Sequence, residues 1–361
     1  MADATDLFVY VGTYTSEESE GIYAYKLDKQ TGDMTPLHVA KNIENPSFLE
    51  ISADKKYLYS VHELNNYKGK RTGAVRSFQI DGETGNLTLL SEQPSNGEHP
   101  CHVSVTPDGA FVLLANYSSG SVAMFPSDNG ALQVACDTAQ HVGSGPNKSR
   151  QKGPYAHSIN ISPDGRFAFS PDLGCDKIMN YIIDTERAVL VPNPKQKFLS
   201  TTSGAGPRHF TFHPNGKLAF AIHELNSTIT AFKYDKTDGI LTEIETVSTL
   251  PKDYTDESTC ADIHVSPDGA FLYGSNRGHD SLAIFKIDAA NGTLALVGFE
   301  PTGGKTPRNF GIDPSGAFLL AANQDSDTIV VFQIDKKTGL LTKTAVEANI
   351  SKPVCVEFVA L

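Results

Sequence analysis

The chain has 361 residues, of which 39% are hydrophobic and 20% charged, and its formal net charge at pH 7 is −12. That composition excludes an intrinsically disordered chain. The acidic balance, without any run of Lys and Arg, argues against nucleic acid or an anionic membrane as a partner. The five cysteines are scattered and form no CxxC pair, so neither a disulfide framework nor a zinc knuckle is predicted.

The chain begins with MADATDLFVY, in which acidic residues stand where a secretory signal would carry basic ones. No stretch approaches the ~18 consecutive apolar residues of a membrane-spanning helix. We therefore expect a soluble, cytoplasmic protein, and we take it to be a monomer or a weak dimer.

The first apolar runs, LFVYVGTYT (7–15) and GIYAYKLDKQTGDMTPL (21–37), are typical of short strands. After them, one pattern recurs: two β-rich runs joined by a turn of Pro, then Asp, Asn or Ser, then Gly. Proline presets φ, Asp or Asn bonds its own backbone, and glycine accepts positive φ, so these residues predict tight turns. After a degenerate copy at 50–62, the copies are SVTPDGAFVLLAN (104–116), INISPDGRFAFSPD (159–172), TFHPNGKLAFAIH (211–223), HVSPDGAFLYGSN (264–276) and GIDPSGAFLLAAN (311–323).

The spacing of these copies indicates a repeat protein. The turn prolines are 56, 51, 53 and 47 residues apart, at Pro107, Pro163, Pro214, Pro267 and Pro314. Each copy continues into a third strand such as TITAF (228–232) and, after a turn, a fourth such as ILTEI (240–244). A period near 50 with four strands per unit favours a β-propeller. No segment has sustained 3.6-residue periodicity, so helix should be nearly absent.

Six units run from residue 45 to about residue 344, and the two ends of the chain complement each other. The tail KPVCVEFVAL (352–361) resembles a first strand alone, while the head resembles strands two to four. We therefore predict an all-β, seven-bladed β-propeller with four antiparallel strands per blade, forming one domain over residues 1–361. Its last blade is closed by the N- and C-terminal strands, which removes exposed sheet edges. The absence of Trp excludes the WD40 type.

The order of the strands in a blade assigns each loop to one of the two faces of this ring. The Pro-Asp-Gly turns lie on one face, and the loops between strands two and three lie on the other with the links between blades. Arg208 and Glu224 both belong to the second face. At six residues before the turn proline, the aligned blades carry Ser47, Cys101, His157, Arg208, Ala261, Arg308 and, in the closing blade, Val354. In the loop after strand two they carry Glu63, Tyr117, Leu173, Glu224, Arg277 and Gln324.

A scaffold needs only small or apolar residues near the axis, so the charged members of both columns are candidate functional residues. Burying an unpaired charge is costly unless it is paired or serves a ligand. The functional interpretation is an anion site with an acid–base group, and the structural alternative is a solvated rim with salt bridges. Asn276 belongs to a column that is polar in every blade, where capping of loop backbone is the structural interpretation. His102 and His209 either line the channel or are satisfied interior histidines.

Several stretches resemble the lactonase family of seven-bladed propellers, and the resemblance covers essentially the whole chain. They are GPYAHSINISPDGRF (153–167), GPRHFTFHPNGKLAFAIHEL (206–225), SPDGAFLYGSNRGHDSLAIF (266–285) and PRNFGIDPSGAFLLAANQDSDTI (307–329). That family includes a type of bacterial 6-phosphogluconolactonase and the fungal 3-carboxy-cis,cis-muconate lactonizing enzyme. The catalytic His, two Arg and Glu proposed for the fungal branch fall by motif on His157, Arg208, Glu224 and Arg277.

The resemblance implies hydrolysis of 6-phosphoglucono-δ-lactone, a small anionic substrate of the pentose phosphate pathway. We expect His157 to be the general base, with Glu224 as the open alternative. Arg277 or Arg208 would stabilise the oxyanion. Substrate binding is expected from Arg308, Lys305, His102, His209 and Asn276. The alternatives are a carboxymuconate-type cycloisomerase and a non-enzymatic protein-binding propeller.

No cofactor and no metal are expected. Calcium-dependent lactonases on propellers need several inward carboxylates, whereas here Glu224, Asp262 and Asp172 are interleaved with arginines.

Overall fold

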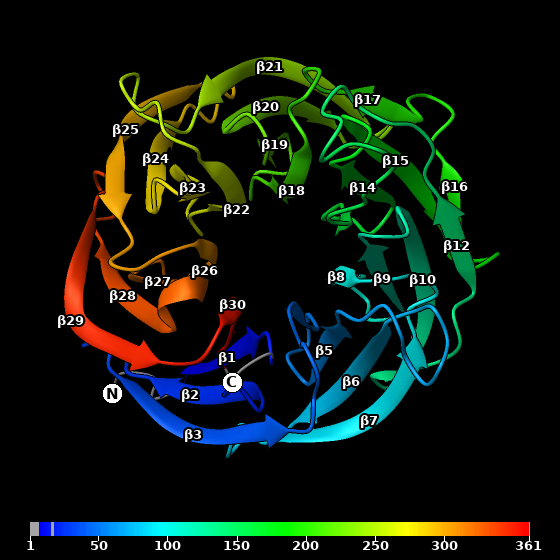
Figure 1. The fold of residues 1–361 in the computed structure, drawn as a ribbon, viewed down its shortest axis with the longest axis horizontal. Coiled ribbons are helices and arrows are strands. Elements are labelled where there is room, and N and C mark those ends of the chain that lie inside the picture. The colour runs from blue at the N-terminus through cyan, green and yellow to red at the C-terminus, as the bar shows by residue number, and fades with distance from the viewer. Residues whose placement is uncertain (1–6, 16–17, 361) are drawn as a thin grey trace.

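Seven antiparallel β-sheets surround a common axis in the computed structural model, which describes residues 7–15 and 18–360 (Figure 1). This confirms the predicted seven-bladed propeller. Residues 1–6, on which the expectation about a secretory signal rests, lie outside the described residues. In the described part of the chain the one helical element is the short 3-10 turn η1 (Gln324–Ser326), and no helix is long and apolar enough to cross a membrane.

The strands of each blade are given from the axis outward. The first blade has β4 (Leu49–Ile51), β5 (Tyr57–His62), β6 (Ala74–Ile80) and β7 (Leu87–Pro94). The fourth has β18 (Pro207–Phe212), β19 (Leu218–His223), β20 (Thr228–Asp235) and β21 (Ile240–Ser248). The fifth has β22 (Thr259–Val265), β23 (Phe271–Arg277), β24 (Ser281–Ile287) and β25 (Leu294–Pro301). The sixth has β26 (Pro307–Ile312), β27 (Phe318–Asn323), β28 (Thr328–Ile334) and β29 (Leu341–Asn349).

The second and third blades differ because their outermost strand is divided in two. The second has β8 (Pro100–Val105), β9 (Phe111–Asn116) and β10 (Ser121–Asp128), with β11 (Ala131–Leu132) and β12 (Asp137–Gln140) both paired to β10. The third has β13 (Asn160–Ile161), β14 (Phe167–Asp172) and β15 (Lys177–Asp184), with β16 (Val189–Pro192) and β17 (Phe198–Ser200) both paired to β15. In the third blade Pro192 and Pro194 stand at the break, where neither can donate a ladder hydrogen bond.

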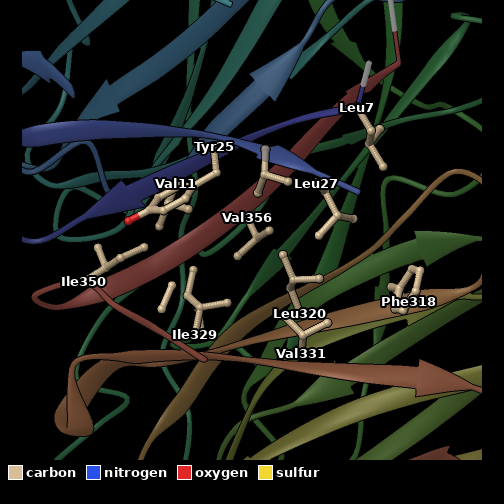
Figure 2. Close-up of a cluster of buried hydrophobic side chains, with 13 residues drawn as sticks. Leu7, Val11, Tyr25, Leu27, Phe318, Leu320, Ile329, Val331, Ile350 and Val356 are labelled. Atoms are coloured by element: carbon tan, nitrogen blue, oxygen red, sulfur yellow. The ribbon is translucent and has the colours of Figure 1, made fainter. Parts of the chain in front are cut away.

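The closing blade joins the two ends of the chain, as predicted. It consists of β30 (Pro353–Ala360), β1 (Leu7–Thr13), β2 (Gly21–Leu27) and β3 (Met34–Lys41). The innermost strand, β30, pairs antiparallel with β1 from Leu7↔Ala360 to Thr13↔Pro353. Figure 2 shows side chains of this blade, among them Val11 and Val356, packed against Leu320 and Val331 of the sixth blade. Apolar packing between blades therefore completes the ring.

The Pro-Asp-Gly turns are built by the residues that the sequence pattern singled out. Asp108 Oδ1 accepts a hydrogen bond from Thr106 Oγ1 at 2.6 Å, and Gly109 has a φ of 73°. The same hydroxyl-to-aspartate bond recurs at 2.6 Å between Ser162 and Asp164, and again in the fifth blade. The polar groups of these turns bond within the turn itself. We therefore assign the turns a structural role and look for functional residues on the opposite face.

Inter-blade packing can be tested at Leu320, which is fully buried between the sixth and closing blades. Replacing Leu320 by Ala should lower the free energy of unfolding by about 2–5 kcal/mol, because the packed core leaves a cavity. The matched change Leu89→Ala, at a side chain that is 52% exposed, should change it by less than about 0.5 kcal/mol. Urea unfolding measures both, and equal losses would contradict this packing.

Candidate functional site

The first sequence column corresponds to a β-bulge in the innermost strands. In five of the blades that the structure describes, the innermost strand skips register against its neighbour. A bulge leaves a residue unpaired and re-aims its side chain. The skipped positions are Cys101, Arg208, Ala261 with Asp262, Arg308 and Val354. The bulge explains why this column is free to vary and why it carries charge toward the axis.

Arg208, on β18, and Glu224, which directly follows the neighbouring strand β19, form a buried ion pair. Arg208 Nε donates to Glu224 Oε2 at 3.1 Å, and its Nη1 donates to the carbonyl oxygen of Ala261 at 2.5 Å. The two side chains are only 2% and 4% exposed. Burial and the charges of Arg277 and Arg308 lower the pKa of Arg208 to about 10, which still leaves it protonated at pH 7. Arg208 therefore holds Glu224 in place from within the protein.

Glu224 is the centre of the site because guanidinium groups from several elements meet on its carboxylate. Arg277 Nη2 lies 2.9 Å from Oε2, and Arg150 Nη2 hydrogen-bonds Oε1. Burial opposes ionisation of Glu224, but Arg277, Arg208 and Arg150 outweigh it and lower its pKa to about 2. The carboxylate is thus ionised at any physiological pH and is poorly suited to accept or donate a proton.

His157 lies beside this carboxylate as a neutral imidazole. Its Nε2 is 3.9 Å from Glu224 Oε2, and its Nδ1 is 3.8 Å from the sulfur of Cys101. The ring of Tyr117 contacts it edge-on, with centroids 5.2 Å apart. Burial, followed by the neighbouring Arg208, His209 and Arg308, keeps the pKa of His157 well below its usual 6.5. An unprotonated imidazole next to a fixed negative charge can accept a proton and have the resulting cation stabilised.

A second group of polar residues faces the cluster from the sixth, closing and first blades. The guanidinium of Arg308 lies over the ring of Tyr14, 5.4 Å from its centroid. The Tyr14 hydroxyl and the Ser47 hydroxyl both donate to Glu63 Oε2, at 2.8 and 2.6 Å. Burial opposes the charge on Arg308, but Tyr14, Glu63 and Glu224 outweigh it and raise its pKa. Arg308 is salt-bridged to no carboxylate that the structure describes, so its charge is available to an anion.

His209 lies beneath Arg208 and is fully hydrogen-bonded. Its Nδ1 is 2.7 Å from Asp262 Oδ1, and its Nε2 is 3.1 Å from Arg208 Nη1. Since arginine can only donate, His209 accepts at Nε2 and donates from Nδ1. Burial and Arg208 lower the pKa of His209 to about 4. His102 stacks on Phe48 and contacts His209 edge-on, at 4.2 and 5.5 Å between centroids. Both histidines therefore lie in the interior under the site.

Below these histidines the channel is acidic. A cavity of about 270 Å³ is lined by His102 and His209 and, toward the Pro-Asp-Gly turns, by Glu50, Asp262 and Glu357. Burial raises the pKa of Glu50 and of Glu357, and neighbouring carboxylates add to the rise at Glu357. No group of three or more His, Cys, Asp or Glu side chains in residues 7–15 and 18–360 is arranged to hold a metal ion. The two ends of the channel thus differ in charge.

The structure brings His157, Arg208, Glu224 and Arg277 together and places Arg308 across from them. The expectation that Asn276 binds substrate is corrected. Its side chain is fully buried and donates to the carbonyl oxygen of Thr249 at 2.8 Å, just as Asn116 and Asn323 bond equivalent links at 3.1 Å. Lys305 is exposed and lines a separate recess with His279 and Asp325.

Sequence comparison of the blades missed Arg150, which meets Glu224 from the link between β12 and β13. No column contains it, because the link between these blades has no counterpart elsewhere in the repeat. The Tyr117–Tyr155 pair beside His157, stacked with centroids 4.9 Å apart, was likewise not proposed as part of the site. The sequence offered only a weak signal, three cations in NKSRQK (147–152), and KGKR (68–71) contains as many.

The charge on Glu224 should be visible in the pH dependence of stability. Its pKa is about 2 in the folded protein against an ordinary 4.5, so its contribution is full above pH 4.5 and is lost as the pH falls through about 2. Glu224→Gln should lower the free energy of unfolding at pH 7 by about 3–5 kcal/mol, because buried guanidinium groups lose their counterion. The deficit should shrink between about pH 4.5 and 2.

Urea unfolding at several pH values measures this deficit. Glu347→Gln is a suitable control because its pair with Lys343 is exposed, and it should cost at most about 1 kcal/mol. A deficit for Glu224→Gln that does not depend on pH would contradict the ionised state.

Comparison with known proteins gives one consistent family. A family model described as "Lactonase, 7-bladed beta-propeller" matches residues 8–358. The 6-phosphogluconolactonase of Bacillus subtilis is 40% identical over 302 residues, covering 83% of each chain. The 6-phosphogluconolactonase of Formosa agariphila is 38% identical over 306 residues, covering 84% of this chain and 85% of the relative.

Solved structures agree with this over nearly the full length. A Bacteroides fragilis protein superposes with a TM-score of 0.92 at 40% identity, covering 99% of both chains. The periplasmic gluconolactonase of Pseudomonas aeruginosa superposes with a TM-score of 0.91 at 34% identity, covering 98% of this chain and 99% of that one.

Proposed function

The chain belongs to the lactonase family of seven-bladed β-propellers, and from that membership we propose that it hydrolyses 6-phosphoglucono-δ-lactone to 6-phosphogluconate. The observation that carries the proposal is the neutral His157 beside the ionised Glu224, which is itself held by arginines. Relatives named 6-phosphogluconolactonase at 40% and 38% identity support the choice of substrate.

The charge at this mouth suits an anionic substrate. Four guanidinium groups face two carboxylates there, which leaves an excess of two positive charges in a chain whose formal net charge is −12. The six residues are Arg150, Arg208, Arg277, Arg308, Glu63 and Glu224. A phosphate monoester carries about −1.5 to −2 charges at pH 7. The local excess attracts such a group, while beyond about 8–10 Å the acidic remainder of the surface is screened.

In the proposed reaction, His157 is the general base. It takes a proton from water as the oxygen of that water attacks the lactone carbonyl, and a tetrahedral oxyanion forms. His157 then returns the proton to the ring oxygen as the carbon–oxygen bond breaks, giving the open hydroxy acid. Glu224 stabilises the imidazolium in between, since it lies 3.9 Å away and is already ionised. Binding of an anion also neutralises guanidinium charge near His157 and so raises its pKa toward the working range.

Arg277 is the proposed donor to the oxyanion. Its Nη2 bonds Glu224 and the carbonyl oxygen of Cys260, at 2.9 and 2.8 Å, while its Nε is buried without a partner. Its side chain is 15% exposed, against 2% for Arg208. Arg208 is therefore assigned a positioning role, and Arg308 and the exposed Lys305 are assigned attraction of the anionic substrate.

We also place the protein in the cytoplasm, as a monomer or a weak dimer. All five cysteines are free thiols in the structure, as a reducing compartment would keep them. The site draws on elements of a single chain, so it does not require a partner subunit.

The base assignment is tested by His157→Gln. After subtraction of spontaneous lactone opening, kcat for 6-phosphoglucono-δ-lactone should fall by about 10²–10⁴-fold, because the proton acceptor is lost. His38→Gln, on the outermost strand β3, is the matched control and should leave the rate unchanged. Acid release measures both rates. A corrected rate for His157→Gln within about twofold of wild type would remove His157 as the base.

The pH profile gives an independent test. Because the pKa of His157 is well below 6.5, kcat/KM should not fall as the pH passes through that ordinary histidine value and should fall only in more acid solution, where His157 becomes protonated. Arg308→Gln removes one of the charges that depress this pKa and should move the acid limb to higher pH. A limb that does not move, or moves to lower pH, would contradict the assignment.

A further inference from the structure

Arg150 differs from the other arginines on Glu224 in its exposure. Its side chain is 40% exposed, whereas those of Arg208 and Arg277 are 2% and 15% exposed. It contacts Oε1 of Glu224, while the other two contact Oε2. A guanidinium carries five N–H donors in a planar fork. With Nη2 on Glu224 and a further contact to the Tyr117 hydroxyl, Arg150 still has donors that can face an incoming ligand.

The loop that carries Arg150 is shaped by a local turn at Asn147 and is anchored to the third blade through Gln151. Asn147 Oδ1 accepts hydrogen bonds from the backbone N–H groups of Ser149 and Arg150, both at 3.1 Å. Gln151 is 1% exposed, and its Nε2 donates to Leu173 O and to Asp176 Oδ1 at 2.8 and 2.7 Å.

Glycine at position 145 leaves room for the Gln151 side chain. A Cβ on Gly145 would come within 2.4 Å of the Gln151 side-chain amide. An exposed arginine is therefore presented at a fixed place over the site, which reduces the entropy lost when it binds a ligand.

The different exposure of the site's side chains determines how a phosphorylated lactone would be oriented in it. His157 and Arg277 lie deeper, with side chains that are 6% and 15% exposed, so the reacting carbonyl belongs there. The charged end of the substrate then points outward to the rim, where Arg150 is exposed. Phosphate is recognised best by the bidentate fork of arginine.

We propose that Arg150 binds the phosphate group of the substrate and thereby distinguishes a phosphorylated lactone from an unphosphorylated one. This inference rests on the proposed function, because it assumes that the phosphorylated lactone is hydrolysed at this site. Arg150 is a specificity residue in this scheme and takes no part in proton transfer.

The experiment compares kcat/KM for 6-phosphoglucono-δ-lactone with kcat/KM for glucono-δ-lactone, each corrected for spontaneous opening. In Arg150→Ala the ratio of the two should fall about 10- to 100-fold, mainly through KM for the phosphorylated substrate. Arg150→Lys should recover part of the ratio, since it keeps the charge but loses the fork. Inorganic phosphate should inhibit glucono-δ-lactone hydrolysis by the wild type more strongly than by Arg150→Ala.

Lys148→Ala is the matched control, because Lys148 is an exposed cation in the same loop and only two residues away. It should leave the ratio unchanged, which separates a direct contact from a general loss of charge. Thermal unfolding of each variant checks that the loop substitutions leave the protein folded.

Equal losses on both substrates in Arg150→Ala would overturn the inference and assign Arg150 to support of Glu224 alone. A drop in the ratio for Arg308→Gln but not for Arg150→Ala would also overturn it. A wild-type protein that hydrolyses glucono-δ-lactone but not its 6-phosphate would instead refute the proposed function, and that outcome is visible before any variant is measured.

Discussion

Burial of the Glu224 carboxylate is the constraint on which the arrangement of the site depends. An ionised carboxylate enclosed by protein is tolerated only where positive charge and hydrogen bonds replace water. Glu224 obtains them from Arg208 on the innermost strand of its own blade, Arg277 on the next blade and Arg150 on a link between blades. The Glu224 carboxylate therefore joins the fourth blade, the fifth blade and the link between the second and third blades through ion pairs. Burial, reinforced by this concentration of positive charge, keeps His157 unprotonated.

Much of this arrangement could be predicted from the repeat. Turn chemistry and the spacing of the prolines predicted the blades, and complementary ends predicted the closing one. His157, Arg208 and Arg308 stood out in their column because they are polar or charged where a scaffold needs small or apolar residues. The structure places Arg208 and Arg308 at bulges, where pairing no longer restricts the side chain. Asn276 was misassigned because its hydrogen bond to Thr249 repeats in other blades as scaffold. Arg150 was missed because alignment of blades says nothing about a link that occurs once.

The sequence also could not decide between His157 and Glu224 as the proposed proton acceptor. His157 and Glu224 are equally plausible as residue types, and only their surroundings separate them. Arginines surround Glu224 and hold it ionised, whereas His157 is nearly buried and kept neutral. The groups along the channel change in the same way with depth. His209 and Asp262 lie between the arginines and the carboxyl groups of Glu50 and Glu357. Positive charge is therefore concentrated at one end of the axis, while burial raises the pKa of the carboxyl groups at the other end and disfavours their ionisation.

The pairing of β1 with β30 has a consequence for how the protein is made. Leu7 and Ala360 are neighbours in one sheet although nearly all of the described chain separates them in sequence. Blades one to six can form as the chain emerges from the ribosome, whereas the earliest strands must wait, without their axial partner, for the last ones. Tyr14 follows β1 directly and its hydroxyl donates to Glu63, so one wall of the candidate site depends on a strand that gains its axial partner last. The order in which the strands emerge therefore makes this wall of the site one of the last parts of the ring to be assembled.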